Sequence, residues 1–130
     1  MATWDLRTTK HHVLICNGSS CKKAGAEEVT QAIRREISNR DLDSVIHTSR
    51  TLCNGRCLDK CVVISYPEGV WYKEILPEDA PAFVDSILFQ KGLESKISHI
   101  YTQDVFFPTE GTVIGKMKDK ETVKKVSKKM

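Results

Sequence analysis

Residues 12–21 of the chain read HVLICNGSSC, and this stretch decides how the fold begins. Its apolar, β-prone first half ends at a cluster of turn-forming residues, which predicts a buried strand that runs into a loop. Over residues 24–39, apolar side chains recur at three- and four-residue spacing, so an amphipathic helix follows. A second β-prone run, at 44–48, leads into another loop at 52–60 that is rich in Cys, Asn and Gly. The order predicts a strand, a helix and a second, parallel strand.

The next segments predict a hairpin and a second helix. Residues 61–66 are β-prone, 67–69 are Pro-Glu-Gly, and 70–73 are β-prone again. The second helix begins near the prolines at 77 and 81 and ends near Gly92. Residues 97–107 suggest one more short element of undetermined type. We therefore expect an α/β fold with a thioredoxin-like arrangement: β-α-β, then a β-hairpin and a covering C-terminal helix.

Length and composition fit one globular domain. The chain has 130 residues, of which 40% are hydrophobic and 28% charged. We expect an N-terminal extension at 1–11, a domain at 12–92, and a C-terminal extension at 93–130 with a Lys-rich tail. No stretch approaches the roughly 20 apolar residues of a membrane span, and the start lacks the order of a secretory signal. These features predict a cytoplasmic protein with no membrane contact.

Charge is concentrated at the C-terminus. The net charge of the chain is +3, and residues 116–130 alone hold seven lysines against Asp119 and Glu121, a local +5. Such a run is typical of a solvated tail. It contains no arginine or aromatic residue to contact bases, so nucleic-acid binding is not expected.

The five cysteines point to metal or redox chemistry, because a reducing compartment does not sustain structural disulfides. Four residues separate Cys16 from Cys21 and three separate Cys53 from Cys57. Each pair is a local chelate. A right-handed β-α-β crossover brings the loops after both strands to one edge of the sheet. Thiolates from separate turns could then converge on iron and sulfide.

These motifs resemble a known family. They are HVLIC at 12–16 with Cys21, Gly25-Ala26, CNGRC at 53–57, and YPEGVWY at 66–72 followed by Pro77-Glu78-Asp79. The sequence resembles the thioredoxin-like 2Fe-2S ferredoxins, which include the small cluster subunit of respiratory complex I. The resemblance implies one 2Fe-2S cluster on Cys16, Cys21, Cys53 and Cys57. It also implies a one-electron carrier and a homodimer. The loops contain no evident set of nucleophile, base and orienting group, so we expect no substrate chemistry of its own. A reductive step of tetrapyrrole or cobalamin biosynthesis is the setting that the resemblance suggests.

The register of the second pair has an alternative. Many family members have Gly-Pro or Ala-Pro just after the last ligand, where this chain has Lys60-Cys61. Cys57 and Cys61 are also three residues apart, so Cys61 is an alternative ligand. We favour Cys53 with Cys57, because the distance from Cys57 to the Tyr66-Pro67 motif matches the resemblance. Cys61 is then a buried thiol that packs like a small apolar residue.

Three other kinds of site compete with the cluster. Zinc also binds four sulfurs, which leaves a zinc-stabilised binding module without redox activity as the alternative function. A thiol-disulfide oxidoreductase would need a Cys-x-x-Cys motif, which is absent. A Rieske site would need paired Cys-x-His motifs, also absent, so we interpret His11, His12 and His47 as strand or surface residues. Trp71 and Tyr72 are expected to pack in the core or at a dimer contact.

Five cations lie close to the ligands in sequence: Lys22, Lys23, Arg50, Arg56 and Lys60. Positive charge there would stabilise the reduced state and attract an acidic partner. Attraction of this kind gives a fast, transient complex that weakens with salt.

Overall fold

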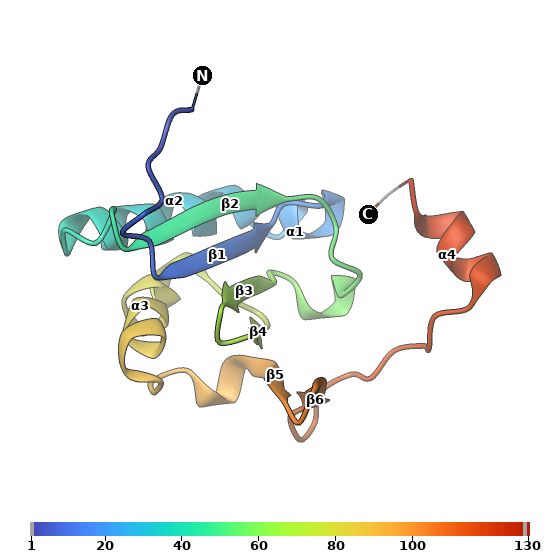
Figure 1. Ribbon diagram of the computed structural model, residues 1–130. Coiled ribbons are helices and arrows are strands. Elements are labelled where there is room, and N and C mark those ends of the chain that lie inside the picture. The colour runs from blue at the N-terminus through green and yellow to red at the C-terminus, as the bar shows by residue number, and fades with distance from the viewer. Residues whose placement is uncertain (1, 129) are drawn as a thin grey trace.

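The computed structural model describes residues 2–128 and 130 and contains a six-stranded mixed sheet (Figure 1). Its strands are β1 His11–Cys16, β2 Ile46–Thr51, β3 Val63–Tyr66, β4 Val70–Tyr72, β5 Ile97–Thr102 and β6 Val105–Pro108. Their order is β2-β1-β3-β4-β5-β6, with β1 and β2 parallel and the other neighbouring pairs antiparallel. The expected β-α-β unit and hairpin are confirmed.

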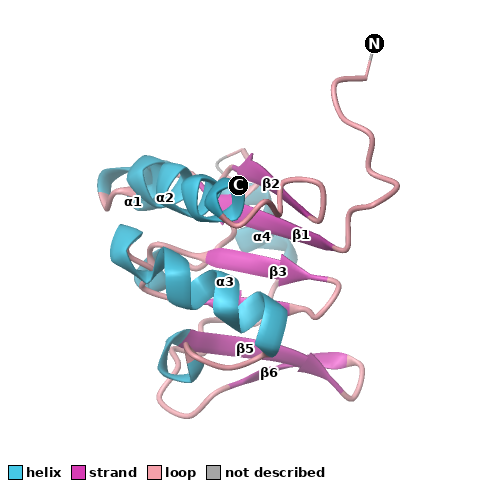
Figure 2. Ribbon diagram, turned by 90° about the vertical axis from the view of Figure 1, so that its left-hand side faces the viewer, coloured by secondary structure: helices cyan, strands magenta, loops and turns pink. Residues whose placement is uncertain are grey.

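The helices are α1 Ser19–Lys23, α2 Ala26–Asn39, α3 Ala80–Phe89 and α4 Lys120–Val126. Figure 2 shows α1, α2 and α3 on the same side of the sheet. α2 buries Val29, Ile33 and Ile37, which recur every four residues and so share one helix face. This face joins the core that holds Val13 and Ile15 of β1, both fully buried. The packing fixes the position of the loop that follows β1.

The helix expected over 24–39 differs in one respect, because a separate short helix precedes it. Gly25 has a φ of 100° and separates α1 from α2. A left-handed conformation of this kind favours glycine. α1 carries Cys21, whose side chain is buried. Five residues are too few to show helical periodicity in the sequence, so this helix was not predicted.

The sheet continues past residue 92, the expected end of the domain. β5 pairs antiparallel with β4, and β6 with β5. The Lys-rich tail contains α4, whose first turn is capped by Asp119: its carboxylate accepts a hydrogen bond from the Thr122 N–H at 2.9 Å. No helix in the described part of the chain is long and apolar enough to cross a bilayer.

Candidate metal centre

Two cysteine pairs meet at one end of the sheet. Cys16 is the last residue of β1, Cys21 lies on α1, and Cys53 and Cys57 follow the end of β2. Because β1 and β2 are parallel, both loops leave the same edge, as the crossover argument predicts. The loops are in close contact: a methyl group on Gly18 would lie 2.8 Å from the Cα of Cys53.

The first pair is buried and hydrogen-bonded. The Cys16 thiol lies 3.5 Å from the Leu52 carbonyl oxygen, to which it donates when protonated, and the donors Cys21 and the N–H groups of Gly18 and Asn54 stabilise its ionised form. These donors hold the pKa of Cys16 well below its usual range, at about 5. The hydrogen bond with Cys16, together with burial, raises the pKa of Cys21. Of the two, Cys16 is the cysteine whose ionised form its surroundings favour.

The second pair lies nearer the surface. The sulfurs of Cys53 and Cys57 are 3.5 Å apart, and the Gly55 N–H donates to the Cys53 sulfur at 3.3 Å. Burial raises the pKa of Cys53, and the Gly55 N–H opposes this shift. Gly55 has a φ of 80°, which turns the backbone so that its N–H faces the sulfur. Cys57 is exposed to solvent.

Cys61 belongs to neither pair. It is 2% exposed, and its thiol lies 3.6 Å from the carbonyl oxygen of Cys21 and 3.7 Å from that of Ala24. Burial raises the pKa of this thiol. Cys61 precedes β3 rather than beginning it, because the strand starts at Val63.

The pair of Cys53 and Cys57 has the dimensions of a two-sulfur chelate. Two sulfurs bound at about 2.3 Å to one tetrahedral metal lie about 3.8 Å apart. The 3.5 Å between Cys53 and Cys57 is close to this distance. Among residues 2–128 and 130, no three His, Cys, Asp or Glu side chains converge on a point that would hold a single ion. Two adjoining thiol pairs, with the Gly55 N–H donating to the Cys53 sulfur, fit a two-metal centre ligated by thiolates.

The histidines make other contacts. His11 Nδ1 lies 2.5 Å from a Glu68 carboxylate oxygen, and His12 Nε2 lies 2.9 Å from the Ser49 hydroxyl. The ring of His47 packs 5.2 Å from that of His12, measured between centroids. His11 and His12 lie at the start of β1, the opposite end of the strand from Cys16.

Two of the five cations near the ligands are paired. Arg50 forms an ion pair with Glu27 and Arg56 with Asp59, each at 2.7 Å. Lys22, Lys23 and Lys60 are exposed and form no ion pair within the described residues.

No family model matches the sequence. The chain is 51% identical over 104 residues to a Priestia megaterium protein named as a candidate 2Fe-2S ferredoxin, a match that covers 80% of each chain. The chain belongs to the 2Fe-2S ferredoxins. A "Ferredoxin, 2Fe-2S" of Clostridium pasteurianum is 33% identical over 85 residues, or 59% of this chain and 83% of that one.

This ferredoxin belongs to the thioredoxin-like branch of the family. The solved thioredoxin-like [2Fe-2S] ferredoxin of Aquifex aeolicus superposes with a TM-score of 0.65 and 27% identity, over 76% of this chain and 99% of that one. The expected fold and family are confirmed. Ferredoxins of this kind carry electrons, and this is the general function of the chain. The relation to complex I and the identity of the ligands stay predictions.

The structure also places the chain around Val113 and Ile114 next to the loop of Cys53 and Cys57, which the sequence did not predict. Arg56, between Cys53 and Cys57, donates to the main-chain carbonyl oxygens of Val113 and Ile114. The side chain of Met130 lies against Gly55, because a methyl group on Gly55 would be 2.7 Å from its Cε. Nothing in the sequence near 113 signals this return.

Proposed function

We propose that this ferredoxin holds one 2Fe-2S cluster on Cys16, Cys21, Cys53 and Cys57 and carries single electrons between protein partners. The proposal rests on the observation that two thiol pairs meet at one edge of the sheet. In the outer pair, Cys53 and Cys57, the sulfurs are 3.5 Å apart. When bound, a cluster of this type takes up and releases one electron.

The polypeptide contributes hydrogen bonds to the ligand sulfurs. The Gly55 N–H donates to the Cys53 sulfur at 3.3 Å, and the N–H groups of Gly18 and Asn54 help to lower the pKa of Cys16. Such donors stabilise negative charge on sulfur and favour the reduced state. A side chain at Gly18 would collide with the backbone of Cys53, and the positive φ of Gly55 turns its N–H toward the Cys53 sulfur.

The two pairs differ in their access to a partner. Cys16 and Cys21 are 3% and 2% exposed, whereas Cys57 is open to solvent. We infer that electrons enter and leave on the side of Cys53 and Cys57, where a docked protein comes nearest. Lys22, Lys23 and Lys60 add positive charge to this end of the molecule. A partner held by such charges binds transiently, and the complex weakens as salt rises.

The predictions of oligomeric state and of pathway rest on the family resemblance. We propose a homodimer, and the use of its electrons in a reductive step of tetrapyrrole or cobalamin biosynthesis. Size-exclusion chromatography with light scattering tests the first, and electron transfer to the reductive enzymes of those pathways tests the second. A monomer at micromolar concentration, or no transfer, would overturn them.

Anaerobic purification tests the cluster itself. The expected protein is red-brown, contains about two irons and two acid-labile sulfides per chain, and bleaches on reduction. A colourless protein with about one zinc per chain would instead establish the alternative, a zinc-stabilised binding module.

Single cysteine variants test the ligand register. Cys53→Ser should lose or strongly alter the visible spectrum, whereas Cys61→Ala should keep it, because the Cys61 thiol faces the carbonyl oxygens of Cys21 and Ala24. Loss of the cluster in Cys61→Ala with retention in Cys53→Ser would assign Cys61 as the ligand instead.

A further inference from the structure

The chain returns from β6 to the loop that carries Cys53 and Cys57 (Figure 1). We call residues 109–128 the C-terminal segment. Its start is fixed to β5, since the Thr109 hydroxyl donates to the Ile97 carbonyl at 2.6 Å and shares a 2.7 Å hydrogen bond with Thr112. Lys73 reaches Thr112 at 3.4 Å.

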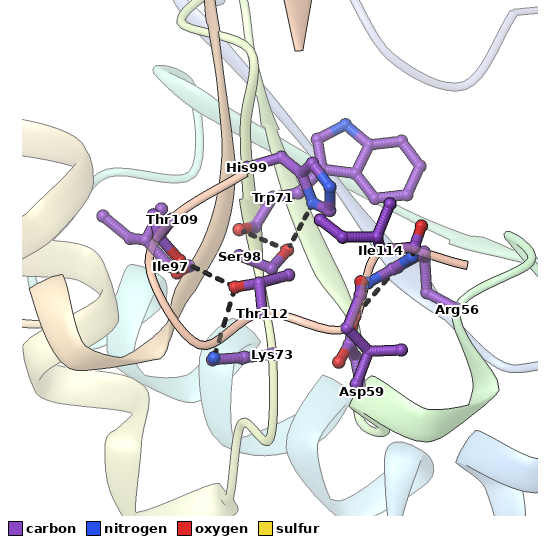
Figure 3. Close-up of polar contacts among 11 residues, drawn as sticks. Arg56, Asp59, Trp71, Lys73, Ile97, Ser98, His99, Thr109, Thr112 and Ile114 are labelled. Atoms are coloured by element: carbon purple, nitrogen blue, oxygen red, sulfur yellow. Dashed lines mark hydrogen bonds and ion pairs between the residues drawn. The ribbon is translucent and has the colours of Figure 1, made fainter. Parts of the chain in front are cut away.

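Arg56 attaches the C-terminal segment to the loop at 52–60 that carries Cys53 and Cys57, which we call the ligand loop. Its guanidinium donates to the Val113 carbonyl and, at 3.2 Å, to the Ile114 carbonyl (Figure 3). The same guanidinium forms an ion pair with Asp59. Because Asp59 is only 5% exposed, this pair keeps the Arg56 side chain in one position. These contacts keep the segment beside the outer cysteine pair.

A groove of about 920 Å³ lies between the ligand loop and the C-terminal segment, and Cys53 and Cys57 line it. Apolar side chains form much of its wall: Leu58, Trp71, Ile114, Val123 and Val126. Leu58 and Ile114 are 76% and 67% exposed. Clustered exposed apolar side chains of this kind are typical of interaction surfaces.

Lysines surround the groove. Lys116 and Lys118 line it, and Lys120, Lys124 and Lys125 follow on α4. All five are exposed, and none forms an ion pair with another described residue. Residues 1–115 have a net charge of −2, against +5 for 116–130, so positive charge is concentrated on this wall. Like charges held close together repel, and an acidic surface would relieve this repulsion.

We propose that this groove is the docking surface for an acidic redox protein. The inference rests on the proposed function and adds the place and chemistry of docking to it. The apolar wall accepts apolar side chains of the partner, and Lys116 and Lys118 meet its carboxylates. A protein seated there contacts the Cys53–Cys57 loop, from which the electron leaves. Nucleic acid fits less well, because the lysine-bearing wall at 113–130 contains no arginine and no aromatic side chain, and Arg56 of the opposite wall is already paired with Asp59.

The test compares two charge reversals on the full-length protein. K116E/K118E changes the groove, and K10E/K91E is the matched control, with the same change in net charge. Lys10 precedes β1 at the end opposite Cys16, and Lys91 follows α3; both are exposed. Flavodoxin serves as the acidic probe and cytochrome c as the basic probe. Binding is measured by calorimetry, and oxidation of the reduced protein by stopped flow, at low and moderate salt.

Wild type should bind flavodoxin more tightly than cytochrome c, and K116E/K118E should slow transfer to flavodoxin about tenfold at low salt while speeding transfer to cytochrome c. The control should change either rate less than about twofold, and added salt should remove the difference. Opposite changes with the two probes identify docking. A change in the reduction potential of the protein alone would move both electron-transfer rates in the same direction.

Three results would overturn the inference: equal effects of both double variants, no preference for flavodoxin, or lysine-dependent binding of a duplex DNA oligonucleotide that is tighter than binding of flavodoxin. The calorimetric arm needs no electron transfer. A chain that lacks iron but binds flavodoxin through these lysines would refute the proposed function and keep the docking surface.

Discussion

Gly18 and Cys53 come from different loops and lie in direct contact, since a methyl group on Gly18 would be 2.8 Å from the Cα of Cys53. Gly18 has a φ of −62°, which any residue adopts. The glycine is therefore required for space rather than for conformation. Through this contact the two cysteine pairs are held at a fixed separation.

Gly18→Ala should push the ligand loops apart. Overpacking of this kind costs about 1–3 kcal/mol, so we expect the free energy of unfolding to fall by that amount and the iron content per chain to fall with it. Denaturant titration and an iron assay give the two values.

Gly111→Ala is the matched control, because no atom lies within 4 Å of the added methyl group while the φ of 81° strains the alanine. This variant should lose some stability but keep its iron. Wild-type iron content and stability in Gly18→Ala would contradict the fixed separation.

The cysteine loops were predictable because their position follows from a general rule. A parallel β1–β2 pair joined by a helix must place both following loops at one edge, and the spacing of Cys16, Cys21, Cys53 and Cys57 is visible in the sequence. The close approach of Gly18 to Cys53 was not predictable, because glycine after a strand is also an ordinary turn former.

The C-terminal part could not be predicted for two reasons. The β5–β6 turn uses Gln103 and Asp104, both at positive φ, instead of the Asn-Gly or Asp-Gly pair that signals such hairpins. Arg56 binds the C-terminal segment through carbonyl oxygens of Val113 and Ile114, and every residue supplies a carbonyl. A contact of this type leaves no pattern in the side chains.

Arg56→Gln should both destabilise the domain and release the C-terminal segment. The substitution leaves the Asp59 carboxylate, only 7% exposed, without its partner at 2.7 Å. We expect the free energy of unfolding to fall by about 3 kcal/mol. Trypsin should then cut faster after the lysines of 116–128, as mass spectrometry of the fragments would record.

Arg50→Gln is the control, because its pair with Glu27 is 40% and 47% exposed. Loss of such a pair costs at most about 1 kcal/mol and should leave the C-terminal lysines protected. Equal proteolysis of both variants would show that Arg56 does not hold the segment.

Tyr72→Phe tests the attachment of α3 to the sheet. The Tyr72 hydroxyl and the Ser86 hydroxyl share a buried hydrogen bond of 2.7 Å. Its removal should lower the free energy of unfolding by about 1 kcal/mol and leave the visible spectrum unchanged. In Tyr101→Phe, where the ring is 47% exposed, the change should stay within about 0.5 kcal/mol. The double variant Tyr72→Phe/Ser86→Ala should lose less than the sum of its two single changes, and strict additivity would exclude the hydrogen bond.

His12 should titrate abnormally. His12 is an exposed residue, but partial desolvation, and then the nearby His47, lower its pKa from 6.5, so the folded state favours the neutral ring. The unfolded chain binds the proton more readily, which means that the contribution of His12 to stability is complete above pH 6.5 and is lost as the pH falls through the lower folded pKa. NMR titration of the ring protons should give a His12 pKa below 6.5. In His47→Gln this pKa should rise only part of the way, because burial is the larger cause; a value of 6.5 or above in the wild-type protein would show that the ring is not shielded from water.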